Sequence, residues 1–133
     1  TVGPSTLGIP LGRNKEAQRL KHIFDVALLS RQGYEIKKVK KSLEACMVQE
    51  NHIQNTGFSF AQVFDDTVLF CSEPLKHENQ PPLASVPENT YFYEIVKGFD
   101  EFKTHLFRMD YTWQAFRQDC GRVIKVLEEV KGI

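Results

Sequence analysis

The sequence predicts an α+β domain: two amino-terminal helices, a small antiparallel sheet, and a long carboxy-terminal helix packed across it. Three observations lead to this prediction. Apolar residues recur at helical spacing before residue 48, aromatic residues recur at every second position after Gly57, and ten apolar residues at helical spacing run from Phe99 to Val130. With 133 residues, the chain is long enough for one domain with a sizeable core.

Residues 1–14 contain three glycines and two prolines and show no sustained periodicity. We expect a flexible arm or a linker there. Residues 15–133 are then the single globular domain.

Two helices are predicted next. The first follows Asn14, the predicted cap, and ends near Arg31, where Gly33 supplies a left-handed stop. Its apolar residues recur at steps of three and four and are Ala17, Leu20, Ile23, Phe24, Ala27 and Leu28. The second begins near Tyr34 and places Ile36, Val39, Leu43 and Cys46 or Met47 at helical steps. Its end, Ala45 to Val48, also fits a buried strand, because short apolar runs do not separate the two.

The predicted sheet combines a hairpin over residues 58–71, turning at Asp65-Asp66, with a third strand over residues 91–96. Between them, residues 73–90 contain four prolines and little hydrophobic pattern, which predicts a long mobile loop. The alternative is an all-α bundle in which residues 58–71 form a third helix.

The carboxy-terminal stripe comprises Phe99, Phe102, Leu106, Met109, Trp113, Phe116, Cys120, Val123, Leu127 and Val130. Its spacing fits one long helix or two helices, with Asp110 as a cap for the second. The aromatic first half suits a core. The second half is wider than a single seam requires, which predicts that a partner protein covers it. The predicted partner-binding residues are Ile124, Val126, Leu127 and Val130.

Charge is distributed unevenly although the net charge is zero. Residues 1–41 contain nine basic and three acidic residues, whereas residues 42–101 contain two basic and ten acidic residues. The densest basic cluster consists of Lys37, Lys38, Lys40 and Lys41, which we interpret either as the solvated face of a helix or as a contact for phosphate or nucleic acid.

The sequence contains none of the short motifs that indicate catalysis, phosphate binding or metal binding. The three cysteines are too far apart for a C-x-x-C pair, and the four histidines form no metal-binding motif, so we expect no metal and no cofactor. No phosphate-binding loop or nucleophile elbow is found. No apolar run reaches the length of a membrane span.

These observations favour a non-catalytic protein-interaction module of a larger intracellular protein, cytoplasmic or nuclear, that binds another protein or a second copy of itself through the carboxy-terminal helix. One alternative is a nucleic-acid-associated domain using the basic region at residues 31–41. Another is an enzyme without a recognisable motif. We expect no membrane association.

Overall fold

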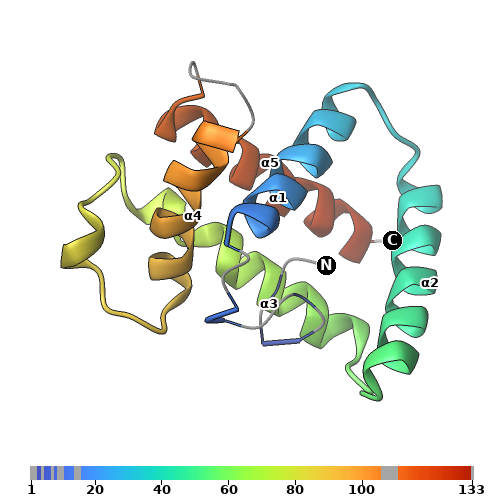
Figure 1. Cartoon of the computed structure of the whole chain (residues 1–133). Coiled ribbons are helices and arrows are strands. Elements are labelled where there is room, and N and C mark those ends of the chain that lie inside the picture. Colours follow the sequence, from blue (N-terminus) through green and yellow to red (C-terminus); the bar gives the residue numbers. More distant parts are fainter. Residues whose placement is uncertain are drawn as a thin grey trace.

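The computed structural model describes residues 3, 5, 6, 8, 11–13, 16–105 and 111–132, with side chains for all but 103–105. Five α-helices and two short 3-10 helices form this part of the chain (Figure 1). The α-helices are α1 (Glu16–Arg31), α2 (Ile36–Gln54), α3 (Phe60–Ser72), α4 (Tyr91–His105) and α5 (Trp113–Lys131). The described residues contain no strand, so the α+β prediction is wrong and the all-α alternative is the architecture found.

The two predicted amino-terminal helices are α1 and α2. Leu20, Ile23 and Ala27 of α1 are fully buried, and Gly33 follows with a φ of +92° that a residue with a Cβ rarely adopts. Asn14 lies outside the described residues. Helix α2 continues through the apolar run that also fitted a strand and ends at Gln54; the next residue, Asn55, caps it with left-handed backbone angles.

Helix α3 replaces the predicted hairpin. Ser59 accepts a hydrogen bond from the Gln62 amide, and the Gln62 side chain accepts one from the Ser59 amide. This reciprocal capping box starts a helix. The Asp65-Asp66 pair therefore lies inside α3 and makes no turn; Asp65 is exposed and Asp66 is buried.

The predicted third strand, residues 91–96, is the first part of α4. Thr90 accepts a hydrogen bond from the Tyr93 amide and so caps this helix. The carboxy-terminal stripe is divided between α4 and α5. Leu106, Met109 and Asp110 lie outside the described residues, and Thr112 is the residue that caps α5, accepting from the Ala115 amide.

The core is rich in aromatic side chains from α4 and α5. The rings of Phe99 and Trp113 pack edge to face at 5.3 Å between centroids, and Phe99 and Phe116 lie 5.6 Å apart. The indole Nε1 of Trp113 donates to the carbonyl of His77, so the buried polar end of the side chain has a partner. The described aromatic residues of the first half of the stripe, Phe99, Phe102, Trp113 and Phe116, therefore belong to the core, as predicted.

Helices α1 and α4 cross closely and carry charges into their interface. Arg19 and Glu94 are both buried, with Nη1 and Oε2 separated by 3.5 Å, and Glu16 pairs with Lys97 at 3.1 Å. Arg19 Nε has no hydrogen-bond partner. Burial lowers the pKa of Arg19, and the nearby carboxylate of Glu94 opposes this shift.

The described residues of the predicted arm contact this helical body. The amide of Ser5 and the hydroxyl of Thr6 each donate to Asp66 Oδ2 at 2.9 Å, and the amide of Gly12 donates to Glu94 Oε1 at 2.7 Å. The predicted loop contains the 3-10 helices Pro74–Lys76 and Leu83–Ser85. None of the described helices is both long and apolar enough to span a membrane.

Candidate binding groove

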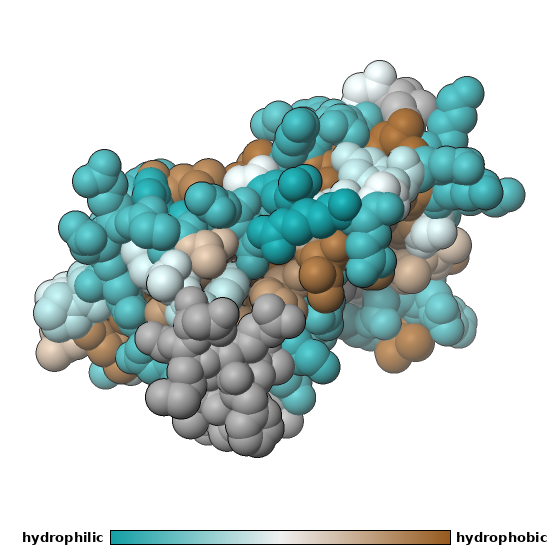
Figure 2. Space-filling model, turned by 90° about the horizontal axis from the view of Figure 1, so that it is seen from above, coloured by the Kyte–Doolittle hydropathy of each residue, from teal (hydrophilic) through white to brown (hydrophobic). Residues whose placement is uncertain are grey.

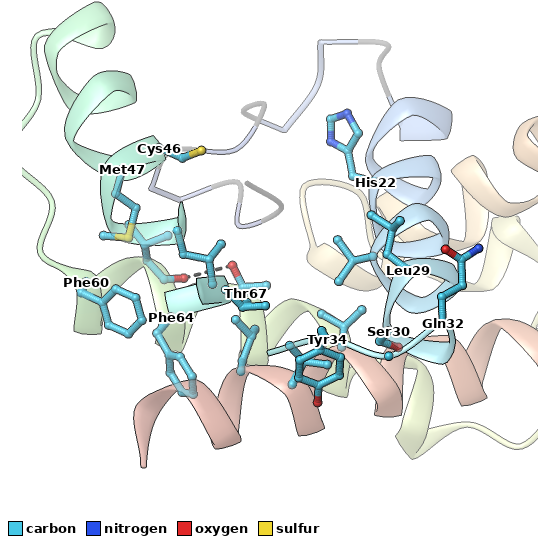
Figure 3. Close-up of a pocket in the computed structure, with 18 residues that line it drawn as sticks. His22, Leu29, Ser30, Gln32, Tyr34, Cys46, Met47, Phe60, Phe64 and Thr67 are labelled. Carbon is cyan, nitrogen blue, oxygen red and sulfur yellow. Dashed lines mark hydrogen bonds between the residues drawn. The ribbon is translucent and has the colours of Figure 1, made fainter. Parts of the chain in front are cut away.

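An apolar cavity of about 470 Å³ lies between α1, α2, α3 and α5 (Figure 3). We call it the groove. Its lining consists of His22, Val26, Leu29, Ser30, Gln32, Gly33, Tyr34, Val39, Leu43, Cys46, Met47, Phe60, Val63, Phe64, Thr67, Val123, Val126 and Leu127. The volume falls in the range of ~300 to 1,000 Å³ that is typical of ligand pockets.

Two helices form opposite walls of the groove. Figure 3 shows Leu29 on the α1 side and Met47 on the α2 side. Residues 39, 43 and 47 of α2 share one face because they lie four positions apart, about one helical turn. The wall on the α2 side is therefore a continuous apolar stripe.

The floor comes from α3 and α5. Phe60 and Phe64, one turn apart in α3, stack with centroids 6.2 Å apart, and the Lys131 ammonium group lies 5.1 Å from the centroid of Phe64. Val63 and Val123, which are part of the lining, are themselves buried. These contacts fix the floor independently of any occupant.

The apolar lining extends to the molecular surface. Val26 is 39% exposed and Leu29 is 62% exposed, although both are large aliphatic residues. Figure 2 shows apolar patches among hydrophilic residues on one face of the molecule. An apolar cavity whose rim is also apolar presents a continuous surface for a partner.

Polar groups of the lining lie mainly toward the α1 side. The hydroxyl of Ser30 donates to the Ala27 carbonyl, and the hydroxyl of Thr67 donates to the Val63 carbonyl at 3.0 Å, so both are engaged within their own helices. Tyr34 donates to Glu129 Oε2 at 2.7 Å. This bond raises the pKa of Tyr34, whereas burial lowers the pKa of His22. The arrangement offers burial of apolar surface and few groups for chemistry.

The structure separates the four predicted partner-binding residues. Val126 and Leu127 line the groove. Ile124 is half-buried against the main core, and Val130 is fully buried. The wide second half of the stripe thus contributes partly to the core and partly to the groove floor.

The lysine cluster lies at the start of α2, mostly on the side away from the groove. Lys37, Lys38 and Lys41 are exposed, and Lys40 is half-buried. At about 100° per residue, positions 37, 38 and 41 turn away from the face that carries Val39. Lys38 also forms an exposed ion pair with Glu35 at 3.4 Å, which contributes little to stability.

Sulfur chemistry and metal binding find little support among the described residues. All three cysteines are free: Cys71 and Cys120 are fully buried, and Cys46 is exposed. Burial raises the pKa of the Cys120 thiol, which disfavours the reactive thiolate. The described residues contain no group of three His, Cys, Asp or Glu side chains placed to hold a metal ion.

The wall of the groove on the α1 side was not predicted from the sequence. Val26 and Leu29 fall outside the core stripe of α1, and their apolar character was a usable sign of a second apolar face on that helix. The Phe60 and Phe64 pair was assigned to a strand, where both rings would also share one face. The lining residues come together only in the folded protein, because α1, α2, α3 and α5 surround one cavity.

Comparisons with known proteins give no relative from which a role can be transferred. This chain matches no protein-family model, no curated protein and no solved structure.

Proposed function

We propose that this chain is a non-catalytic protein-interaction module that binds an amphipathic helix of a partner protein in the groove. The observation that supports this proposal is an apolar cavity bounded by helices on several sides, with apolar residues continuing onto its rim. A helix laid in such a groove buries apolar residues at positions i, i+3 or i+4, and i+7.

The rim favours a partner protein over a small molecule. A small ligand is usually enclosed by its pocket, and it would leave Leu29, which is 62% exposed, largely uncovered. A helix extends beyond the cavity and can cover the rim as well. The floor residues Val126 and Leu127 keep the predicted role of α5 in partner binding within this proposal.

The lining also favours binding over catalysis. The hydroxyls of Ser30 and Thr67 are bound to carbonyls of their own helices, and they do not converge on a common point. Three free thiols support an intracellular location, where disulfides are rare.

The experiment selects helical peptides from a displayed library against the folded chain. Enriched peptides should carry apolar residues at i, i+3 or i+4, and i+7. Leu29→Lys should weaken their binding about tenfold, or ~1.4 kcal/mol, since it replaces an apolar contact at the rim with a charge that the partner helix would have to bury. Leu69→Lys is the matched control, because Leu69 is 53% exposed on α3 and lies outside the groove.

Two results would contradict the proposal: no enrichment of helical peptides, or equal binding by the Leu29 and Leu69 variants. Circular dichroism confirms that both variants stay folded. If only a small apolar dye binds, and Leu29→Lys abolishes that binding, the groove is a small-molecule site and the proposal fails.

A second candidate is nucleic-acid association through α2, favoured by the exposure of Lys37, Lys38 and Lys41 on one side of this helix. If the three lysines each contact a phosphate, a plot of the logarithm of the binding constant against the logarithm of the salt concentration should have a slope of about −2 to −3. Changing the three lysines to glutamine should abolish it. An absence of DNA or RNA binding at low salt would remove this candidate.

A further inference from the structure

We propose that α2 is a hinged lid on the groove, fixed at its carboxy-terminal corner and released at its amino-terminal end when the hydrogen bond between Tyr34 and Glu129 breaks. This inference rests on the proposed function, because it describes how the groove admits its helical partner.

Weak anchoring of α2 is the first observation. Of its 19 residues, only Met47 is buried, while Val48 and Ile53 are 72% and 66% exposed. Met47 belongs to a small cluster with Val63, apart from the main core. Figure 1 shows α2 at one side of the molecule, and the groove lies between it and α1, α3 and α5. A helix with so little buried surface can move without opening the core.

The carboxy-terminal corner of α2 is held by a dense set of hydrogen bonds. Asn51 binds both backbone groups of Phe58: its Nδ2 donates to the Phe58 carbonyl at 2.9 Å, and its Oδ1 accepts from the Phe58 amide at 3.0 Å. Thr56 also donates to Asn51 Oδ1 at 2.9 Å. Met47 packs on Val63 next to this corner. The corner is therefore the fixed end.

The amino-terminal end of α2 is joined to α1 through Gly33 and hydrogen-bonded to α5 through Tyr34. Gly33 has a φ of +92°, and a Cβ placed on it would meet no atom within 4 Å, so the backbone there has both conformational freedom and space. Tyr34 then donates to Glu129 on α5 through an exposed hydrogen bond. Water competes for an exposed bond, so it opens readily.

The two ends together define the motion. Rotation about the Asn51 corner displaces Val39 and Leu43 further than Met47, because both lie further along α2 from that corner. The groove therefore widens from the end where Tyr34 is bonded. Since Tyr34 lines the groove, an entering helix also competes with the contact that holds the lid.

Distances between spin labels test the proposal in the full chain. Labels are attached at Lys41→Cys on α2 and Lys125→Cys on α5, both exposed positions, in a Cys46→Ser background. Cys71 and Cys120 are fully buried and stay unlabelled. Tyr34→Phe should broaden the distance distribution and lengthen its mean by about half a helix diameter, ~5 Å. Tyr93→Phe, which removes a tyrosine hydroxyl from α4, should leave the distribution as in the parent.

Glu129→Ala removes the other partner of the bond and should reproduce the effect of Tyr34→Phe. Unchanged distributions in both variants would overturn the lid. If the selected helical peptides bind but the labels do not move in the variants, the lid is wrong and the proposed function stands. If the labels move but no peptide is enriched, the lid stands and the proposed function is wrong.

Discussion

At the scale of single residues, Gly98 sets how closely α4 can approach α1. A Cβ at this position would lie 2.8 Å from the carbonyl oxygen of Glu16 and 2.9 Å from its Cβ. The obstacle is backbone, which cannot move without shifting α1. Glycine is thus required by the helix crossing that also contains the buried pair of Arg19 and Glu94.

Gly98→Ala should therefore destabilise the domain by about 1 to 3 kcal/mol, the usual effect of overpacking. Gly121→Ala in α5 is the control, because a Cβ there meets no atom within 4 Å, and alanine should stabilise the helix by about 0.5 to 1 kcal/mol. Urea unfolding measures both free energies. Equal effects of the two substitutions would show that the α1–α4 approach is not tight at Gly98.

Tyr111 provides a pH dependence at the same scale. Burial and a hydrogen bond donated to Asp119 raise the pKa of its phenol far above the ordinary value of ~10. The unfolded chain loses this proton near pH ~10 while the folded chain keeps it, so folding stability should fall as the pH rises above ~10.

Phenolate absorbance during alkaline titration tests this expectation. Part of the phenolate signal should appear only when the helical signal in circular dichroism is lost, and Tyr111→Phe should remove that late component. A phenolate signal that is complete while the protein is still folded, and unchanged in timing by Tyr111→Phe, would contradict the buried bond to Asp119.

At the scale of elements, the capping box decides that α3 is a helix. Ser59→Ala removes the acceptor for the Gln62 amide and should destabilise the domain by about 1 kcal/mol. Ser72→Ala, at the other end of α3, removes only a hydroxyl that donates to the Leu69 carbonyl and should stay within about 0.5 kcal/mol of the wild type. Thermal unfolding distinguishes the two, and equal melting temperatures would argue against the cap.

The same elements show how far the sequence could predict the fold. Regular apolar spacing sufficed for α1, α2 and the core half of the stripe. It failed for α3, where alternating aromatic residues suggested a strand although Ser59 and Gln62 already had capping-box spacing. For α4, the short run at residues 91–96 was judged by its β-branched and aromatic content, whereas Phe92 and Ile95 extend the helical spacing of Phe99 and Phe102.

The groove was less predictable than the fold, for a physical reason. Periodicity identifies which face of a helix is apolar, but it does not distinguish a face packed in the core from one lining a cavity. Val126 and Val130 illustrate this limit: they are one turn apart in α5, yet Val126 lines the groove and Val130 does not. Which of the two valines lines the groove depends on where α2 packs against α5, and the spacing of apolar residues within α5 does not contain that information.

At the scale of the whole molecule, stability is divided between a large core and a small cluster. Leu20 and Ile23 of α1, Phe70 of α3, and Cys120 and Val123 of α5 belong to the large core. Helix α2 contributes only Met47, to the small cluster. Local opening requires little energy where little apolar surface is buried, so the two regions should open independently.

Hydrogen exchange under native conditions measures this division directly. Amides in the middle of α2, around Leu43, should exchange at least tenfold faster than those around Ile23 in α1 and Cys120 in α5, because only global unfolding exposes the latter. The opening free energy derived from exchange at these α1 and α5 amides should approach the free energy of global unfolding. Exchange of the α2 amides should respond weakly to denaturant, as expected for a local opening that exposes little surface. The Gly98→Ala variant provides the control: destabilising the main core should accelerate exchange in α1 and α5 while leaving α2 nearly unchanged. Equal protection of α2 and α5, falling together in that variant, would mean that the five helices unfold as one cooperative unit.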